Sequence, residues 1–78
     1  MTTLRLFATV RVAAGTGKAS FSGETVGDVL AAARNEYGPD FAELVPSCRI
    51  WVNGQTADEA TAVTDEDEVA LLPPVSGG

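Results

Sequence analysis

The sequence ends in the stretch Glu68-Val69-Ala70-Leu71-Leu72-Pro73-Pro74-Val75-Ser76-Gly77-Gly78. Residues 68–72 are predominantly apolar and predict a β-strand, which Pro73 ends because proline lacks the backbone N–H that a central strand needs. Proline also fixes φ near about −65°, so Pro73 and Pro74 are expected to leave the folded body as an extended segment. Glycine has no Cβ, so a narrow channel in another protein could close around Gly77 and Gly78. We therefore expect a folded domain over residues 1–72 and an extended, flexible tail over residues 73–78.

The composition fits one small domain and excludes several classes of function. The chain has 78 residues, a net charge of −6, one cysteine and no histidine. Without histidine it lacks the commonest general base and metal ligand, and a single cysteine cannot complete a zinc site, so no bound metal is expected. It has no block of basic residues and no long apolar stretch, which argues against nucleic acid, an anionic membrane surface and a transmembrane helix. The single thiol and the lack of a secretory signal favour a cytoplasmic protein.

Hydrophobic patterns and turn residues give the expected order of elements. Residues 3–11 alternate like a first strand, Gly15-Thr16-Gly17 resembles a hairpin turn, and residues 18–21 form a second strand. Thr25 is a candidate helix N-cap with Asp28 in a capping box, and Gly38-Pro39 ends that helix. The helix buries one stripe of residues, namely Val26, Val29, Leu30, Ala33 and Tyr37.

The second half of the chain is expected to complete the sheet. Phe41, Leu44 and Val45 form a short segment that covers the core, and residues 48–52 form a third strand before a tight turn at Asn53-Gly54. Residues 55–63 hold one short strand, and residues 64–67 turn the chain into the last strand. The expected fold is α+β: a mixed sheet of about five strands packed on one main helix. Its first and last strands lie side by side and parallel because a long crossover separates them.

Strand parity places a second apolar surface on the face of the sheet that points away from the helix. If Leu4 and Leu6 face the helix, then Phe7 faces away, and the same alternation turns Trp51, Ala70 and Leu72 outward. Arg5 and Arg49 border this group, and apolar patches rimmed by arginine are typical of protein interfaces. The alternative is that Trp51 is half-buried under a loop and Phe7 is a stray exposed residue. Cys48 shares parity with Ile50 and is expected to lie in the core, although a reactive thiol remains the alternative.

The element order and the terminal glycines resemble the ubiquitin-like β-grasp proteins and, more narrowly, the small sulfur-carrying subunit of molybdopterin synthase. The resemblance rests on Leu6-Phe7-Ala8-Thr9-Val10-Arg11 with Gly15-Thr16, on Val52-Asn53, and on the block from Asp65 to Gly78. The sequence departs from the common form of that subunit at Leu71-Leu72, where aromatic residues are frequent. The middle of the chain matches in pattern only.

The resemblance implies a carrier that depends on partners for catalysis. An activating enzyme would use ATP to adenylate Gly78, and a sulfurtransferase or other persulfide donor would convert it to a thiocarboxylate. The large synthase subunit would then pass the sulfur to a pterin precursor. The inserted tail would comprise Pro73, Pro74, Val75, Ser76 and Gly77, and the partner-binding patch would comprise Phe7, Arg11, Trp51 and Leu72. The chain itself is expected to bind no cofactor and to be no enzyme alone.

Three other functions stay open at this point. The chain could be a protein modifier that forms isopeptide bonds through Gly78. It could carry sulfur for another pathway, such as thiamine, cysteine or tRNA thiolation. It could also be a plain interaction module whose tail is inert.

Overall fold

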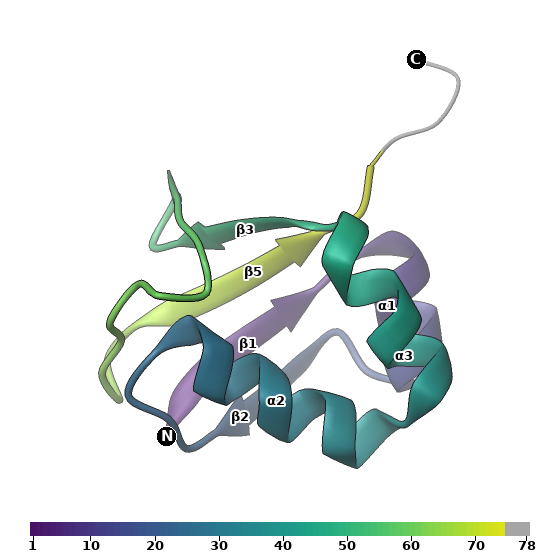
Figure 1. Cartoon of the computed structure of the whole chain (residues 1–78), viewed down its shortest axis with the longest axis horizontal. Coiled ribbons are helices and arrows are strands. Elements are labelled where there is room, and N and C mark those ends of the chain that lie inside the picture. The colour runs from purple at the N-terminus through teal and green to yellow at the C-terminus, as the bar shows by residue number, and fades with distance from the viewer. Residues whose placement is uncertain (75–78) are drawn as a thin grey trace.

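The computed structural model describes residues 1–74 of the chain (Figure 1). The elements follow one another as β1 (Thr2–Leu6), α1 (Ala8–Ala14), β2 (Lys18–Phe21), α2 (Val26–Tyr37), α3 (Pro39–Leu44), the 3₁₀ helix η1 (Val45–Ser47), β3 (Arg49–Val52), β4 (Gln55–Thr56) and β5 (Glu68–Leu72). The predictions made for Val75, Ser76, Gly77 and Gly78 lie outside the described residues.

The strands form one five-stranded mixed sheet in the order β2-β1-β5-β3-β4. The central pair, β1 and β5, is parallel, with Leu4 beside Val69 and Leu6 beside Leu71. The other three pairs, β1–β2, β3–β5 and β3–β4, are antiparallel. The expected ubiquitin-like β-grasp arrangement, with its first and last strands adjacent and parallel, is therefore confirmed.

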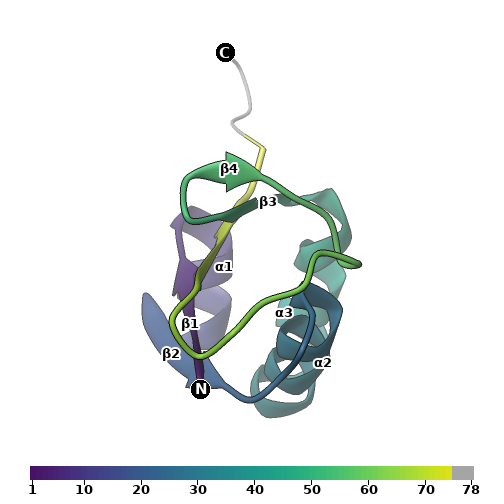
Figure 2. The ribbon, with the colours of Figure 1, turned by 90° about the vertical axis from the view of Figure 1, so that its left-hand side faces the viewer.

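Helices α2 and α3 cover one face of the sheet, and the core lies between these layers (Figure 2). Leu4, Leu6, Val69 and Leu71 point into it from the two central strands and are at most 1% exposed. The other core residues are Val10, Val26, Val29, Leu30, Ala33, Phe41, Val45 and Val63. The helical stripe predicted for residues 26–37 is thus buried as expected. Its last member, Tyr37, is half-buried and makes edge-to-face contacts with Phe21 and Phe41.

Local signals at both ends of α2 act as the sequence indicates. The Thr25 hydroxyl accepts a hydrogen bond from the backbone N–H of Asp28 at 3.2 Å, and the Asp28 carboxylate accepts one from the N–H of Thr25 at 3.3 Å. This reciprocal capping box satisfies N–H groups that the helix leaves free. At the other end Gly38, with φ of 89°, closes the helix, and Pro39 begins α3.

The segment after β1 corrects the sequence analysis. The strand predicted over residues 3–11 stops at Leu6, and residues 8–14 form helix α1 instead. Val10 fits both patterns, since it continues the alternation of β1 and is fully buried as a helical residue. Ala8 has a positive φ of 51°, which turns the chain sharply from strand to helix. The helix ends at Gly15, whose φ is 78°, so residues 15–17 form a helix C-cap and a connection to β2 rather than a hairpin turn.

The tight turn at Asn53-Gly54 is confirmed and joins β3 to β4. Both residues have positive φ, 50° and 84°, as a type I′ turn requires. The Asn53 side chain also donates to the Asp67 carboxylate at 2.8 Å and accepts from the N–H of Glu68 at 2.9 Å. Asn53 therefore ties this turn to the start of β5.

Candidate functional site: the tail exit and the outer face of the sheet

The tail leaves the domain from the central strand of the sheet. Leu72 is the last residue of β5, and Pro73 and Pro74 continue past the end of the strand (Figure 1). Pro73 is half-buried and Pro74 is exposed. Because β1 on one side and β3 on the other both pair with β5, the point of exit is fixed by hydrogen bonds from two neighbours.

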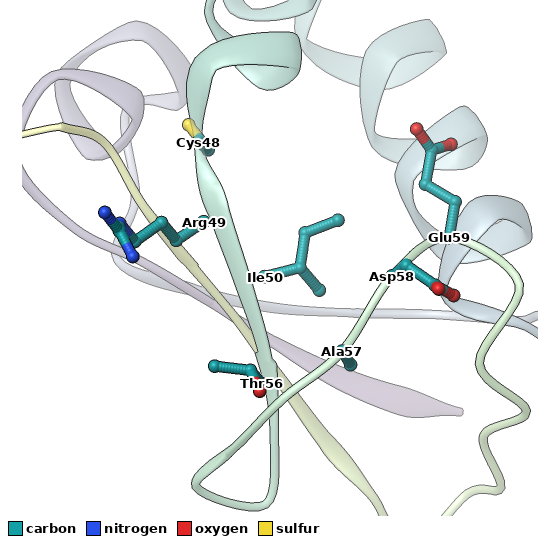
Figure 3. Close-up of a pocket in the computed structure, with 7 residues that line it drawn as sticks. All are labelled: Cys48, Arg49, Ile50, Thr56, Ala57, Asp58 and Glu59. Atoms are coloured by element: carbon teal, nitrogen blue, oxygen red, sulfur yellow. The ribbon is translucent and has the colours of Figure 1, made fainter.

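Side chains on the outer face lie as strand parity predicts. The register places Arg5 beside Ala70 and Ala70 beside Trp51, so these side chains form one row across β1, β5 and β3. Arg49 lies opposite Leu72 in the next row. In Figure 3, Arg49 points to the opposite side of β3 from Ile50, which packs against the core. Trp51, Ala70 and Leu72 are half-buried, whereas their neighbours Val69 and Leu71 are fully buried.

Phe7 adds an exposed aromatic ring at the tail end of this face. It directly follows Leu6, just as Leu72 follows Leu71, so both residues lie where the paired strands end. Phe7 is 38% exposed, and the Arg5 guanidinium lies 5.8 Å from the centroid of its ring, within cation–π range. We call Phe7, Trp51, Ala70 and Leu72 the outer patch.

Arg11 lies beside the outer patch, at the corner where α1 meets β2. A Cβ at Gly17 would sit 3.1 Å from Arg11 Nε, so the guanidinium packs directly over this glycine. Arg11, Arg5, Thr16, Gly17 and Lys18 line a hollow of about 390 Å³, which we call the basic hollow.

Sequence reasoning missed Lys18, Thr16 and Gly17 as members of this site. It also missed Val12, which α1 exposes by 81%. The available signal was the pairing of β1 with β2, which sets Lys18 opposite Arg5.

Cys48 lies at the edge of the core rather than deep within it. Its thiol is half-buried, packs against the core cluster and donates to the Leu44 carbonyl at 3.2 Å. Burial raises the pKa of this thiol above its ordinary value, which disfavours the reactive thiolate. Cys48 also borders a cavity of about 430 Å³ between β3 and residues 56–59 (Figure 3). Asp58 and Glu59 are the acidic residues of this cavity, and nothing in its lining forms a nucleophile–base pair.

The acidic turn before β5 is built from hydrogen bonds. The Asp67 carboxylate accepts from Asn53 Nδ2 and from the N–H of Thr64, each at 2.8 Å. These bonds to Asn53 and Thr64 hold the pKa of Asp67 below its ordinary value, because they favour the charged form. Asp65 instead pairs with the N-terminal ammonium of Met1 at 2.9 Å. The turn lies at the end of the sheet opposite the tail exit (Figure 1).

Two absences hold for the part of the chain that the structure describes. Within residues 1–74, acidic, cysteine and histidine side chains nowhere gather in a group of three that could hold a metal ion. In the same range, every helix is too short or too polar to cross a membrane.

Comparisons with known proteins agree with this architecture over almost the whole chain. Small archaeal modifier protein 1 from Methanosarcina acetivorans has a solution structure that matches with a TM-score of 0.89 and 34% identity, over 99% of this chain and 95% of that one. The crystal structure of the same modifier from Haloferax volcanii matches with a TM-score of 0.83 and 32% identity, over 99% and 98% of the two chains.

A third similar structure is a complex of subunits 1 and 2 of molybdopterin-converting factor from Helicobacter pylori. It matches with a TM-score of 0.72 and 26% identity, over 99% of this chain and 97% of that one. The sequence profile of the ThiS family matches residues 4–78. This chain therefore belongs to the ThiS family of ubiquitin-like sulfur carriers.

Proposed function

We propose that this carrier is the small subunit of a molybdopterin synthase, with Gly78 as its covalent site. The observation that carries the proposal is the exit of the tail from the central strand, directly beside the outer patch of Phe7, Trp51, Ala70 and Leu72. A partner that binds the outer patch holds the tail in one direction, so that the last residues enter its active site. The similar Helicobacter pylori protein is found in a complex with a second subunit, which supports this mode of assembly.

The proposed chemistry solves a problem of leaving groups. A carboxylate does not exchange oxygen for sulfur at neutral pH, because hydroxide is a poor leaving group. A carboxylate oxygen of Gly78 attacks the α-phosphorus of ATP in the activating enzyme, and pyrophosphate departs. A persulfide sulfur then attacks the acyl carbon and displaces AMP. A further thiol cleaves the S–S bond and becomes oxidised to a disulfide, which leaves the thiocarboxylate on Gly78.

In this proposal the domain supplies binding and aim, while its partners supply catalysis. The nucleotide site, the persulfide cysteine and the pterin site all belong to other proteins, and the carrier binds no cofactor itself. Cys48 takes no part, because its thiol is half-buried with a raised pKa. The carrier is thus a sulfur donor to a transferase rather than an enzyme.

The test is the intact mass of the protein isolated from its own cells. Conversion to the thiocarboxylate raises the mass by the difference between sulfur and oxygen. Deleting Gly78 is expected to abolish this change and leave the fold intact, whereas Ser76→Ala, which keeps the terminal carboxylate, retains it. Normal sulfur supply from the Gly78 deletion would show the proposal to be wrong.

A second candidate function is protein modification through an isopeptide bond from Gly78 to a lysine. The specific observation in its favour is identity, since the chain is 34% and 32% identical to the two archaeal modifiers but 26% identical to the converting-factor subunit. Conjugates would appear as larger species on denaturing gels of cell extracts. Because the last basic residue is Arg49, trypsin would leave residues 50–78 attached to the target lysine, which identifies the bond by mass.

A further inference from the structure

Basic side chains gather at the tail end of this acidic protein. The net charge is −6, and the chain has only five basic residues. Arg5, Arg11 and Lys18 line the basic hollow, together with Thr16 and Gly17 and with no acidic residue. The register also puts Arg49 opposite Leu72 on the outer face. Only Arg34 lies elsewhere, on α2, where it pairs with Glu59 at 3.8 Å.

The cations of the basic hollow differ in what holds them. Arg5 is anchored by the Phe7 ring and by Glu68, whose carboxylate lies 3.6 Å from the guanidinium. Arg11 is exposed and rests on Gly17, and Lys18 is exposed on β2. Neither Arg11 nor Lys18 has an ion-pair partner within residues 1–74. The hollow therefore offers two positive charges that the described part of the domain does not neutralise.

Several acidic residues lie away from this corner, whereas Asp40 and Glu43 lie on α3, which packs against α1. Asp65 and Glu66 occupy the turn at the opposite end of the sheet, Asp58 and Glu59 border the cavity beside β3, and Asp28 caps the first turn of α2. Of the acidic side chains, Glu68 alone reaches a cation of the basic hollow within residues 1–74. The corner beside the tail exit therefore carries positive charge on its surface, and the turn at the opposite end of the sheet carries negative charge.

We propose that the basic hollow binds carboxylate side chains on the surface of the protein that receives the tail. This inference rests on the proposed function, because the partner is the activating enzyme or the large synthase subunit. An acidic partner surface repels a carrier of charge −6 in most orientations. It attracts the carrier when the tail exit and the basic hollow face the partner. The outer patch then supplies apolar contact, and the basic hollow selects tail-first approach.

Exposed ion pairs add little affinity, so the effect belongs mainly to the association rate. A single exposed pair is worth about 0.2–1 kcal/mol, or roughly a factor of 1.4 to 5. Charges at the rim of an interface change the association rate and its dependence on salt more than the dissociation rate. The basic hollow is therefore expected to govern how fast the carrier docks rather than how long it stays.

The experiment measures association of the full chain with its activating enzyme by stopped-flow or surface plasmon resonance, without ATP, at low and high salt. Arg11→Gln and Arg34→Gln are a matched pair, because each removes one positive charge and only Arg11 lies in the basic hollow. Arg11→Gln is expected to slow association about two- to fivefold at low salt, with the difference vanishing at high salt. Arg34→Gln is expected to leave the rate unchanged.

Gly17→Ala separates geometry from charge. The added methyl shifts the flexible end of the Arg11 side chain only slightly, so the net charge and the fold stay the same. We expect association close to the wild-type rate at both salt concentrations, because the positive charge stays in the basic hollow. An equal effect of Arg11→Gln and Arg34→Gln, or association that does not respond to salt, would overturn the proposal.

Inorganic phosphate is the probe for the competing explanation, a small-anion site. Phosphate is added while the NMR spectrum is followed. Shifts confined to Thr16, Gly17 and Lys18, together with association that does not depend on Arg11, would overturn the proposal and favour a small-anion site. The readout is also separable from the sulfur chemistry. Salt-dependent docking without any thiocarboxylate contradicts the proposed function alone, whereas normal thiocarboxylate with charge-independent docking contradicts this inference alone.

Discussion

Replacing Phe7 by alanine is expected to weaken partner binding while leaving the domain folded. Phe7 is 38% exposed, and the Arg5 guanidinium lies 5.8 Å from the centroid of its ring. Phe7 is the N-cap residue of α1, but its side chain makes no capping hydrogen bond, and its backbone is extended. Phe7→Ala therefore removes no capping hydrogen bond and introduces no backbone strain.

Phe41 provides a control with the same side chain in the opposite setting, since it is fully buried between α3 and the sheet. Phe41→Ala creates a cavity and is expected to lower the free energy of unfolding by about 3–5 kcal/mol. Phe7→Ala removes a partly exposed ring and one exposed cation–π contact, so the expected loss is about 1–2 kcal/mol. For binding the order reverses, because truncating a central interface aromatic costs about 2 kcal/mol or more, roughly thirtyfold in affinity.

The assay pairs urea unfolding of both variants with calorimetric titration against the large subunit and, separately, the activating enzyme. Phe7→Ala is expected to weaken both complexes, and the two partners are expected to compete for one carrier. If Phe7→Ala cost as much stability as Phe41→Ala and left the affinity per folded molecule unchanged, the ring would belong to the core. Simultaneous binding of both partners would show that they use different surfaces.

Three further changes test the fold and the unused thiol. Asp67→Asn is expected to reduce the loss of stability in acid, which urea midpoints at neutral and acid pH will measure. Hydrogen bonds lower the folded-state pKa of Asp67 below 3.8, so the stability that its carboxylate contributes is present above that value and is lost as the pH falls through the lowered pKa. Cys48→Ala should cost about 1 kcal/mol of packing with sulfur transfer unchanged, and native Cys48 should react with alkylating reagents far more slowly than the unfolded chain. Gly15→Ala meets no neighbouring atom within 4 Å, yet the φ of 78° should cost about 1 kcal/mol, seen as a lower Tm.

The elements that could be predicted are those whose signals are local. The cap of α2 needs only Thr25 and Asp28, which lie within one turn of each other. The turn into β4 needs only Asn53 and Gly54, whose positive φ angles suit these residue types. The end of β5 follows from Pro73 alone, because it has no N–H to pair.

Helix α1 could not be predicted from its pattern. Leu4, Leu6 and Val10 continue an alternation that suits a strand, while Val10, Ala13 and Ala14 also match helical spacing. The choice is made at Ala8, where a positive φ of 51° redirects the chain toward α3. Alanine does not favour that conformation, so the residue type at position 8 gives no signal of the change in direction.

The site divides in the same way. Strand parity alone placed Trp51, Ala70 and Leu72 on the outer face, and it carried Phe7 one residue past the end of β1. The basic hollow could not be predicted from the sequence, because Arg11 contacts Gly17 only when residues 8–14 form α1 instead of continuing the strand. The roles given to residues 75–78 stay predictions, since they lie outside the described residues.

The position of β5 between β1 and β3 also has a mechanical consequence. A force applied to the tail acts along β5, and the hydrogen bonds to both neighbours run across that direction, so they bear the force together in shear. An edge strand such as β4 would instead peel away one bond at a time when pulled sideways. A partner that binds the last glycines and then releases them can therefore pull on the carrier while β5 stays paired with both neighbours.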